Sequence, residues 1–366
     1  MTGTDAVRPG VLAPPRTGDR REQYVSDFTA LTQRVQQAGF MRRAYGYYWT
    51  KLIGLTAAGL GLAVVFVLVG DTWWQLVTAT ALALLMTQIA FLGHDAAHRQ
   101  IFVSGGWNEW VSLVVVNLYA GMGLGWWQHK HTKHHAAPNT VGTDPDIDPG
   151  IVAFTSEAVE ARRTPLTRWL TERQGWFFYP LLLLEGLNLH VQGMRRVLGR
   201  RPVKRRWVEL SFITARLSSY VVLVFLVLPP GKAAAFIGVQ LAVFGLTMGL
   251  AFAPNHIGMP VVPRGVKVDF LRRQVLMSRN ISGGRGVDTL MGGLNFQIEH
   301  HLFPSMARPH LRRVAPLVRA HCDEIGVGYT STTLAQAYKA VTSHINQVGR
   351  GATDVWACPL ATQLRV

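Results

Sequence analysis

Long apolar segments dominate the hydrophobic pattern of this chain. Four of them come close to the twenty or so residues that an α-helix needs to cross the hydrocarbon core of a bilayer, and they span residues 51–69, 73–92, 207–228 and 233–253. The turn-rich connections at 70–72 and 229–232 are too short to hold a folded domain. The pattern therefore predicts an all-α integral membrane protein with four transmembrane helices arranged as two tight hairpins.

Two further apolar segments are shorter. Residues 110–124 are interrupted by glycines near their end, and residues 178–189 form an apolar run of about a dozen positions. We expect both segments to lie along the membrane interface, so that a substrate groove forms between them and the ends of the spanning helices. Glu209 and Arg216 fall inside the third long segment, where a long arginine side chain can reach toward the interface.

Composition supports membrane insertion. The 366 residues are 49% hydrophobic and only 16% charged, below the roughly 25% of a soluble domain. This hydrophobicity also argues against intrinsic disorder. The two cysteines, Cys322 and Cys358, form no CxxC pattern and indicate neither a disulfide framework nor a thiolate metal site.

The net charge of +16 comes from 37 Lys and Arg against 21 Asp and Glu. Residues 161–206 contain eleven basic and two acidic residues, which predicts a cytoplasmic loop. With no apolar signal-peptide core at the N-terminus, we expect both termini in the cytoplasm and a multi-pass protein of the cell membrane. We expect a flexible cytosolic arm over 1–45, a membrane domain over 46–325 and a cytosolic tail over 326–366. No base- or phosphate-recognition motif accompanies the charge, so no nucleic-acid partner is expected.

Histidines cluster at three places. The first cluster has an i, i+4 spacing that brings two imidazoles to one face of a helix, and the second repeats this with three residues. The third has Gln297 at the position of the first histidine. The clusters are His94 and His98; His131, His134 and His135; and His300 and His301.

His256 follows the fourth apolar segment directly, so it should emerge at the same membrane face as the clusters. Eight imidazoles and Gln297 exceed the needs of one tetrahedral site, which implies two metal ions. Imidazole suits Zn, Cu, Fe and Ni, so spacing alone does not identify the metal. Other polar residues nearby are candidates to orient these ligands from behind, although the Asp-Pro repeats among them also form turns: Asp95, His129, Asp144, Asp146, His190, Asn255 and Asn295.

These clusters resemble the three histidine boxes of the membrane fatty-acid desaturase superfamily. His94-Asp-Ala-Ala-His98 fits the HxxxH box, and residues 131–135 fit the HxxHH box. Gln297-Ile-Glu-His300-His301 resembles the QxxHH box of the front-end, linoleoyl-CoA-desaturase-like branch. The similarity covers about residues 45–325.

The resemblance implies a cytosolic cap that carries a di-iron centre held by the box histidines and, by position, by His256 and Gln297. It implies an oxidoreductase that uses O2 and two external electrons to introduce a cis double bond into a long-chain acyl-CoA or acyl-lipid. We expect no fused cytochrome-type haem domain, since no His-Pro-Gly-Gly occurs. Electrons would then come from a separate ferredoxin, cytochrome or flavin oxidoreductase, and ultimately from NAD(P)H.

Three other functions remain open. A fatty-acid or alkane hydroxylase of the same superfamily would use the same metal arrangement. A zinc peptidase is disfavoured because Asp95 stands where the HExxH motif has its glutamate. A membrane metal transporter should hold its ligands near the bilayer midplane, whereas these histidines lie at segment ends and in loops.

Overall fold

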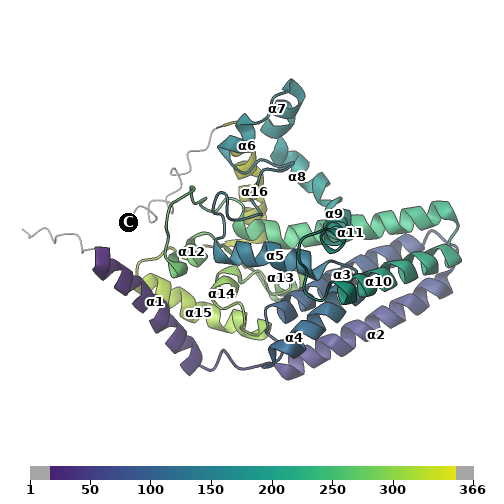
Figure 1. Cartoon of the computed structure of the whole chain (residues 1–366), viewed down its shortest axis with the longest axis horizontal. Helices are drawn as coiled ribbons and strands as arrows, with labels where there is room; N and C mark the ends of the chain where they lie inside the picture. The colour runs from purple at the N-terminus through teal and green to yellow at the C-terminus, as the bar shows by residue number, and fades with distance from the viewer. Residues whose placement is uncertain (1–16, 352–366) are drawn as a thin grey trace, which may run out of the picture.

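The computed structural model describes residues 17–351. Four long helices run side by side and form the right-hand half of the molecule in Figure 1. Each is long and apolar enough to cross a membrane, as the sequence predicted: α2 (Tyr45–Val69), α3 (Gln75–Ala97), α10 (Arg206–Val227) and α11 (Pro230–His256).

Two of these helices continue past the predicted apolar segments. Helix α3 ends at Ala97, five residues beyond its segment, and α11 ends at His256, three residues beyond its segment. Because an unbroken helix holds its side chains at fixed angles, His94 and His256 become part of rigid elements rather than of loops.

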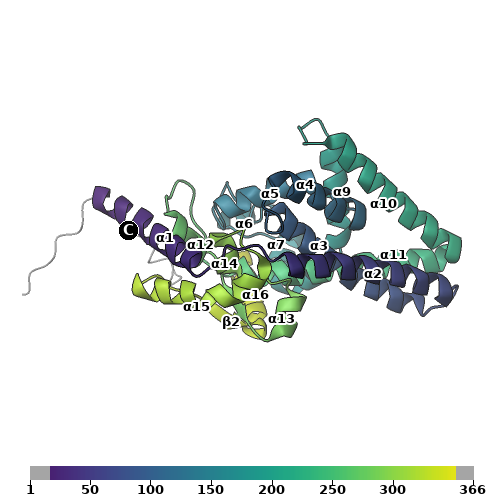
Figure 2. The same ribbon diagram turned by 90° about the horizontal axis from the view of Figure 1, so that it is seen from below.

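The second hairpin has the short connection that the sequence predicted, because α10 ends at Val227 and α11 begins at Pro230, but its two helices splay apart. Helix α11 packs mainly against α3 and α9, whereas α10 packs mainly against η1 (Leu113–Tyr119) and meets α11 only sparsely. Figure 2 shows α10 leaning away from α2 and α3. The π-helix η1 packs against both α3 and α10. An apolar cavity remains between α10 and α2.

The shorter apolar segment around 110–124 does not form one straight helix. Helix α4 (Gly105–Ser112), capped by the Ser104 hydroxyl, continues into η1 and then turns by 119° into α5 (Leu124–Ala136). The turn includes Gly121, whose φ of +71° favours glycine. The bend directs α5, which carries the second histidine cluster, across the end of the helical bundle.

The second short segment is split between two helices of a lateral arm. The arm consists of α6 (Ser156–Glu160), α7 (Pro165–Glu172), α8 (Gln174–Leu182) and α9 (Glu185–Leu198). Helix α9 contacts its neighbours backbone to backbone: a Cβ on Gly186 would lie 2.2 Å from the Leu241 carbonyl oxygen, and a Cβ on Gly193 would lie 2.6 Å from the nitrogen of Gly123. Glycine is required at both crossings because any side chain would separate the helices.

The remaining elements form a cap at the same end of the bundle as α5 (Figure 1). Its largest apolar cluster joins α1, α12, α14 and α15 through residues such as Leu31, Leu271, Ile298 and Val314, all buried. A small parallel sheet pairs β1 with β2. The elements of the cap are α1 (Thr17–Gln37), α12 (Phe270–Leu276), β1 (Asn280–Ser282), α13 (Arg285–Leu290), α14 (Gln297–Leu302), α15 (Arg308–Glu324), β2 (Ser331–Thr333) and α16 (Leu334–Gly349).

The two ends of the described chain are packed. We expected a flexible arm over residues 1–45, but within it α1 is helical and buries Leu31 and Val35. In the expected tail, α16 buries Val341 and Ile345 against Phe178 and Leu182 of α8. The parts of these segments at 1–16 and 352–366, including Cys358, lie outside the described residues.

Candidate metal centre

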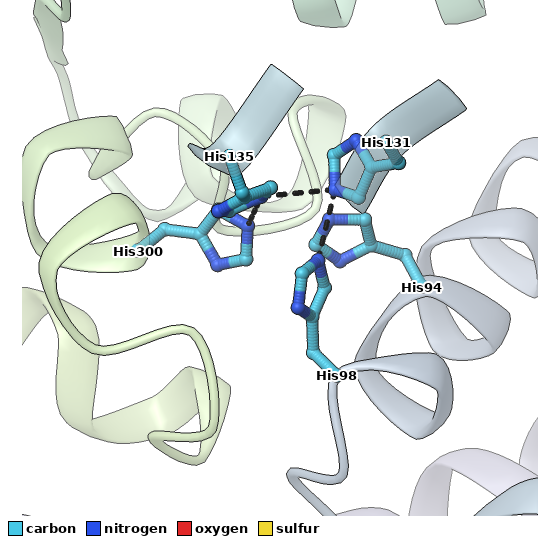
Figure 3. A group of neighbouring side chains, drawn as sticks. All are labelled: His94, His98, His131, His135 and His300. Carbon is cyan, nitrogen blue, oxygen red and sulfur yellow. Dashed lines mark hydrogen bonds between the residues drawn. The ribbon is translucent and has the colours of Figure 1, made fainter. Parts of the chain in front are cut away.

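Five histidines from three helices converge at the end of the bundle (Figure 3). His94 and His98 lie at the end of α3 with their ring centroids 4.6 Å apart. The Nε2 atom of His131 lies 2.8 Å from that of His98 and 3.0 Å from that of His135, and the Nε2 atom of His300 lies 3.2 Å from that of His135. We call these five residues the first histidine group; one ring nitrogen from each lies within 4.8 Å of all the others.

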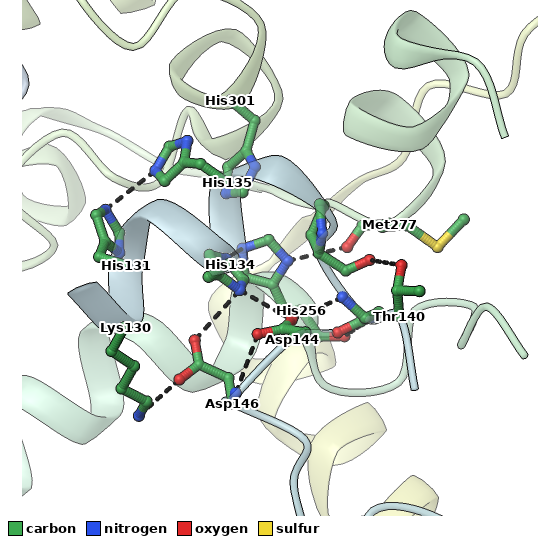
Figure 4. A network of polar contacts seen from close by, with 12 residues as sticks. Lys130, His131, His134, His135, Thr140, Asp144, Asp146, His256, Met277 and His301 are labelled. Atoms are coloured by element: carbon green, nitrogen blue, oxygen red, sulfur yellow. Dashed lines mark hydrogen bonds and ion pairs between the residues drawn. The ribbon is translucent and has the colours of Figure 1, made fainter. Parts of the chain in front are cut away.

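The second histidine group consists of His134, His256 and His301, which also offer nitrogens within 4.8 Å of one another. The Nε2 atoms of His134 and His256 are 3.3 Å apart, and the amide nitrogen of Gln297 lies 3.0 Å from His256 Nε2. Figure 4 shows His134 pointing away from His131 and toward His256. Rotation of the Gln297 amide by 180° would present its oxygen here.

Hydrogen bonding alone does not account for the first group. A neutral imidazole Nε2 carries either one N–H or one lone pair, yet the Nε2 atoms of His131 and His135 each face two other Nε2 atoms. His94 Nε2 and, in the second group, His301 Nε2 are buried without any hydrogen-bond partner.

The spacing of the nitrogens fits shared cations. Two nitrogens bound to one ion at about 2.1 Å lie roughly 3.0–3.4 Å apart at octahedral or tetrahedral angles. The measured separations run from 2.8 to 3.3 Å. The donor set therefore fits a metal ion in each group, and imidazole ligands favour a transition metal.

Hydrogen bonds to the Nδ1 atoms of the second histidine group fix the orientation of its rings. His134 Nδ1 lies 3.0 Å from an oxygen of Asp144 and 3.2 Å from an oxygen of Asp146. His256 Nδ1–H donates to the Met277 carbonyl at 2.9 Å. Each contact leaves Nε2 with its lone pair free to bind a metal.

His301 is oriented by a residue that the sequence did not single out. Its Nδ1–H donates to the side-chain oxygen of Gln274 at 2.9 Å, and the Gln274 amide donates to the carbonyl of His135 at 3.0 Å. Gln274 is fully buried on α12. It thus connects the second and third clusters, and nothing in its local sequence indicates this contact across the cap.

Burial keeps most of these imidazoles neutral. Desolvation is the largest cause that lowers the pKa of His98, His131, His135, His300 and His301, and neighbouring histidines lower it further. For His134, burial acts in the same direction, but the hydrogen bond to Asp144 and the charge of Asp146 outweigh it and raise the pKa. Neutral imidazole is the form that binds metals.

A buried ion pair supports the first group. One oxygen of Asp95 lies 2.7 Å from an Arg308 guanidinium nitrogen, and the other lies 3.6 Å from Nδ1 of His94. Arg308 begins α15 and also donates to the carbonyl of Phe91 at 2.6 Å. The pair connects α3 to the cap, and Arg308 is a second residue missed in the sequence.

The other predicted orienting residues lie at varying distances from the histidines. Asn255 donates to the side-chain oxygen of Gln297 at 3.4 Å, so it contacts a predicted ligand. Asn295 instead donates to Asp288 and to the carbonyl of Ile281. His129 is exposed on α5, and His190 contacts the Gly186 carbonyl on α9. Neither belongs to a histidine group, because their helices turn these side chains elsewhere.

An apolar cavity of about 280 Å³ reaches both histidine groups. Its wall includes Met122 and Gly123 from one short apolar segment and Leu182 and Leu189 from the other, as the sequence predicted for a groove. His94, His131, His134, His256 and Gln297 also line it. Its volume is close to the lower end of the range for small-molecule sites.

Comparison with known proteins identifies relatives. The fatty acid desaturase family model matches residues 71–333, well over half of the chain. The chain is 27% identical to a Delta(8)-fatty-acid desaturase of Helianthus annuus over 85% of its own length and 70% of the relative. It is 30% identical to Delta(8)-fatty-acid desaturase 2 of Arabidopsis thaliana, with 87% and 74% covered, and 30% identical to an acyl-lipid (9-3)-desaturase of Borago officinalis, with 77% and 65% covered.

Proposed function

The chain belongs to the fatty acid desaturase family and is an oxidoreductase, and on that premise we propose that it introduces a cis double bond into a long-chain acyl group. The substrate is an acyl-CoA or an acyl-lipid, and the reaction uses O2 and two external electrons. The observation that carries the proposal is one apolar cavity lined by members of both histidine groups.

We assign two iron ions to the two groups. The first ion is held by His94, His98, His131, His135 and His300, and the second by His134, His256, His301 and Gln297. The unpartnered nitrogens and the short Nε2 separations support this assignment. When bound, the irons supply the O2 activation that breaking an unactivated C–H bond requires and that side chains alone lack.

The residues of the chain position the acyl group. Phe178, Leu182 and Leu189 provide apolar contacts along the cavity, where each buried methylene contributes about 0.8 kcal/mol. Lys130, Asp146 and Glu185 form a polar part of the wall, in which Lys130 is paired with Asp146 at 2.7 Å; we assign this part to the polar head of the substrate. The apolar wall also excludes water from the reacting carbons.

We propose that the protein is a multi-pass protein of the cell membrane with the histidine groups and both termini in the cytoplasm. The cluster of basic residues at 161–206 supports this orientation. The membrane domain comprises residues 46–325, and a separate reduced ferredoxin, cytochrome or flavin oxidoreductase supplies the electrons, drawing on NAD(P)H.

The test is mass spectrometry of fatty acids from a host without desaturases that expresses the protein together with a ferredoxin and its reductase. The control is the matched His300→Ala variant. A new double bond that requires His300 would support the proposal, and its position would give the regiochemistry. A hydroxylated product would assign the chain to the oxygenases of the same superfamily, and unchanged lipids from iron-loaded protein would contradict acyl-chain chemistry.

A further inference from the structure

A second cavity reaches the first histidine group. Its volume is about 600 Å³, and it touches the metal-ligand candidates His98 and His131. Most of its other lining side chains are polar or charged, among them Glu209, which accepts hydrogen bonds from the backbone N–H of Gly125 at 3.1 and 3.2 Å. We call it the polar cavity.

Helix α5 separates the polar cavity from the apolar cavity. Trp126, Lys130 and His134 face only the apolar cavity, whereas His129 and Lys133 face only the polar one. Trp127 and His131 line both cavities. The polar cavity therefore gives access to the centre without passing through the space assigned to the acyl chain.

Trp127 contacts several members of the first histidine group. Its ring stacks on His131 with centroids 4.3 Å apart and an interplanar angle of 25°. Its centroid lies 5.4 Å from that of His94 and 6.1 Å from that of His98, both edge to face. An aromatic side chain thus joins the wall of the polar cavity to three candidate iron ligands.

Basic residues outnumber the two carboxylates, Glu109 and Glu209, around the polar cavity. Arg99 and Lys133 line it, both are exposed, and no carboxylate pairs with either among the described residues. Glu109 is already paired with Lys204 and Arg205. Two further cations, Arg196 and Arg201, lie near His129 in addition to Lys133. Such a field attracts an acidic partner and increases its rate of association.

We propose that an acidic one-electron carrier protein docks over the polar cavity and that its electrons enter through Trp127. This inference rests on the proposed function. Each docked carrier is oxidised by one electron, and two such electrons, two protons and one O2 combine with the two hydrogens removed from the acyl chain to give two waters and one double bond.

Because the two cavities lie on opposite sides of α5, the occupant of the polar cavity is better explained as a protein than as the head group of the substrate. An acyl chain in the apolar cavity would place its head near Lys130 and Glu185, on the other side of α5. The basic residues around the polar cavity are then available to a second molecule. The cofactor of that molecule must come close to the histidine groups, but it need not contact the acyl chain.

The docking test uses full-length protein in nanodiscs and a purified plant-type [2Fe–2S] ferredoxin. The Arg99→Glu/Lys133→Glu double variant should raise the Kd for ferredoxin about tenfold or more at low salt, and the difference should shrink at about 0.5 M salt. Lys339→Glu/Arg350→Glu reverses two exposed cations at α16 and just after it; it makes the same change in net charge and, as the matched control, should leave the Kd unchanged. An unaltered Kd and salt dependence in the double variant would overturn the docking site. A loss of acyl-CoA binding instead of ferredoxin binding would assign the cavity to the substrate head group.

The test of electron entry compares two reductants on iron-loaded protein. In Trp127→Leu, the rate of iron reduction by ferredoxin relative to that by dithionite should fall about tenfold, and Trp127→Phe, which keeps a ring, should recover part of it. A wild-type ratio in Trp127→Leu would refute the route. If dithionite-driven wild-type protein forms the alkene while the variants behave normally with ferredoxin, the proposed function stands and this inference fails.

Discussion

Gln274 offers the sharpest test of the centre, because it accepts a hydrogen bond from His301 Nδ1 and is not itself one of the proposed metal ligands. In Gln274→Met the side chain keeps its length but loses the acceptor for His301 Nδ1–H and the donor to the His135 carbonyl. His301 is then free to rotate or to carry its proton on Nε2, the nitrogen assigned to the metal.

The expected magnitude follows from these two contacts. Loss of a partner that orients a ligand histidine typically weakens metal binding 10–100-fold, which corresponds to about 1.4–2.8 kcal/mol. The abandoned N–H of His301 is buried, so its loss also costs the fold about 1–3 kcal/mol, whereas the His135 carbonyl is only partly buried and its loss costs less. We expect the ion of the second histidine group to be lost first.

The assay is an anaerobic Fe(II) titration of nanodisc-embedded protein, with bound iron measured by mass spectrometry and the thermal midpoint recorded alongside. Gln274→Glu is the control: it keeps an acceptor for His301 but not the donor to His135, so it should recover most of the affinity. Two ions bound by Gln274→Met within twofold of the wild-type affinity would refute the reasoning.

Three further predictions follow from other contacts. Asp144→Leu should weaken iron binding more than Asp144→Asn, because only asparagine keeps an oxygen for His134 Nδ1–H; equal iron titrations for the two would contradict this. Arg308→Met should cost about 3–5 kcal/mol by leaving Asp95 buried and unpaired, seen as a lower thermal midpoint that Asp95→Asn partly restores; an unchanged midpoint would argue against the pair. Burial raises the pKa of Cys322 to about 12, so in a Cys358→Ser background maleimide at pH 8 should label only unfolded protein, and rapid labelling of native protein would show that the cap opens.

The sequence predicted the long apolar helices and the histidines that gather in the two groups for physical reasons that are local. Span length follows from bilayer thickness, and the i, i+4 spacing of His131 and His135 places them within about 40° on a helix. The same geometry turns His134 about 100° from His135, but only the positions of α11 and α14 show that this direction leads to a second group.

Other features depended on contacts that no local pattern reveals. Gln274 and Arg308 reach ligands far along the chain. Helix α1 did carry a usable signal, since Phe28, Leu31 and Val35 follow helical spacing and pack into the cap, yet its polar composition obscured it. The splayed second hairpin depends on how η1 packs against α10, which apolar length alone does not encode.

The close crossings of α9 bear on how such enzymes diversify. Because Gly186 and Gly193 bring α9 into backbone contact with α11 and with the start of α5, the width of the apolar cavity is set by main-chain contacts and cannot easily increase. Side chains that line the cavity, such as Leu189 and Met248, are the parts free to vary. Evolution could thus change which carbon of a bound acyl chain reaches the histidine groups by lengthening or trimming such residues, while every helix stays in place.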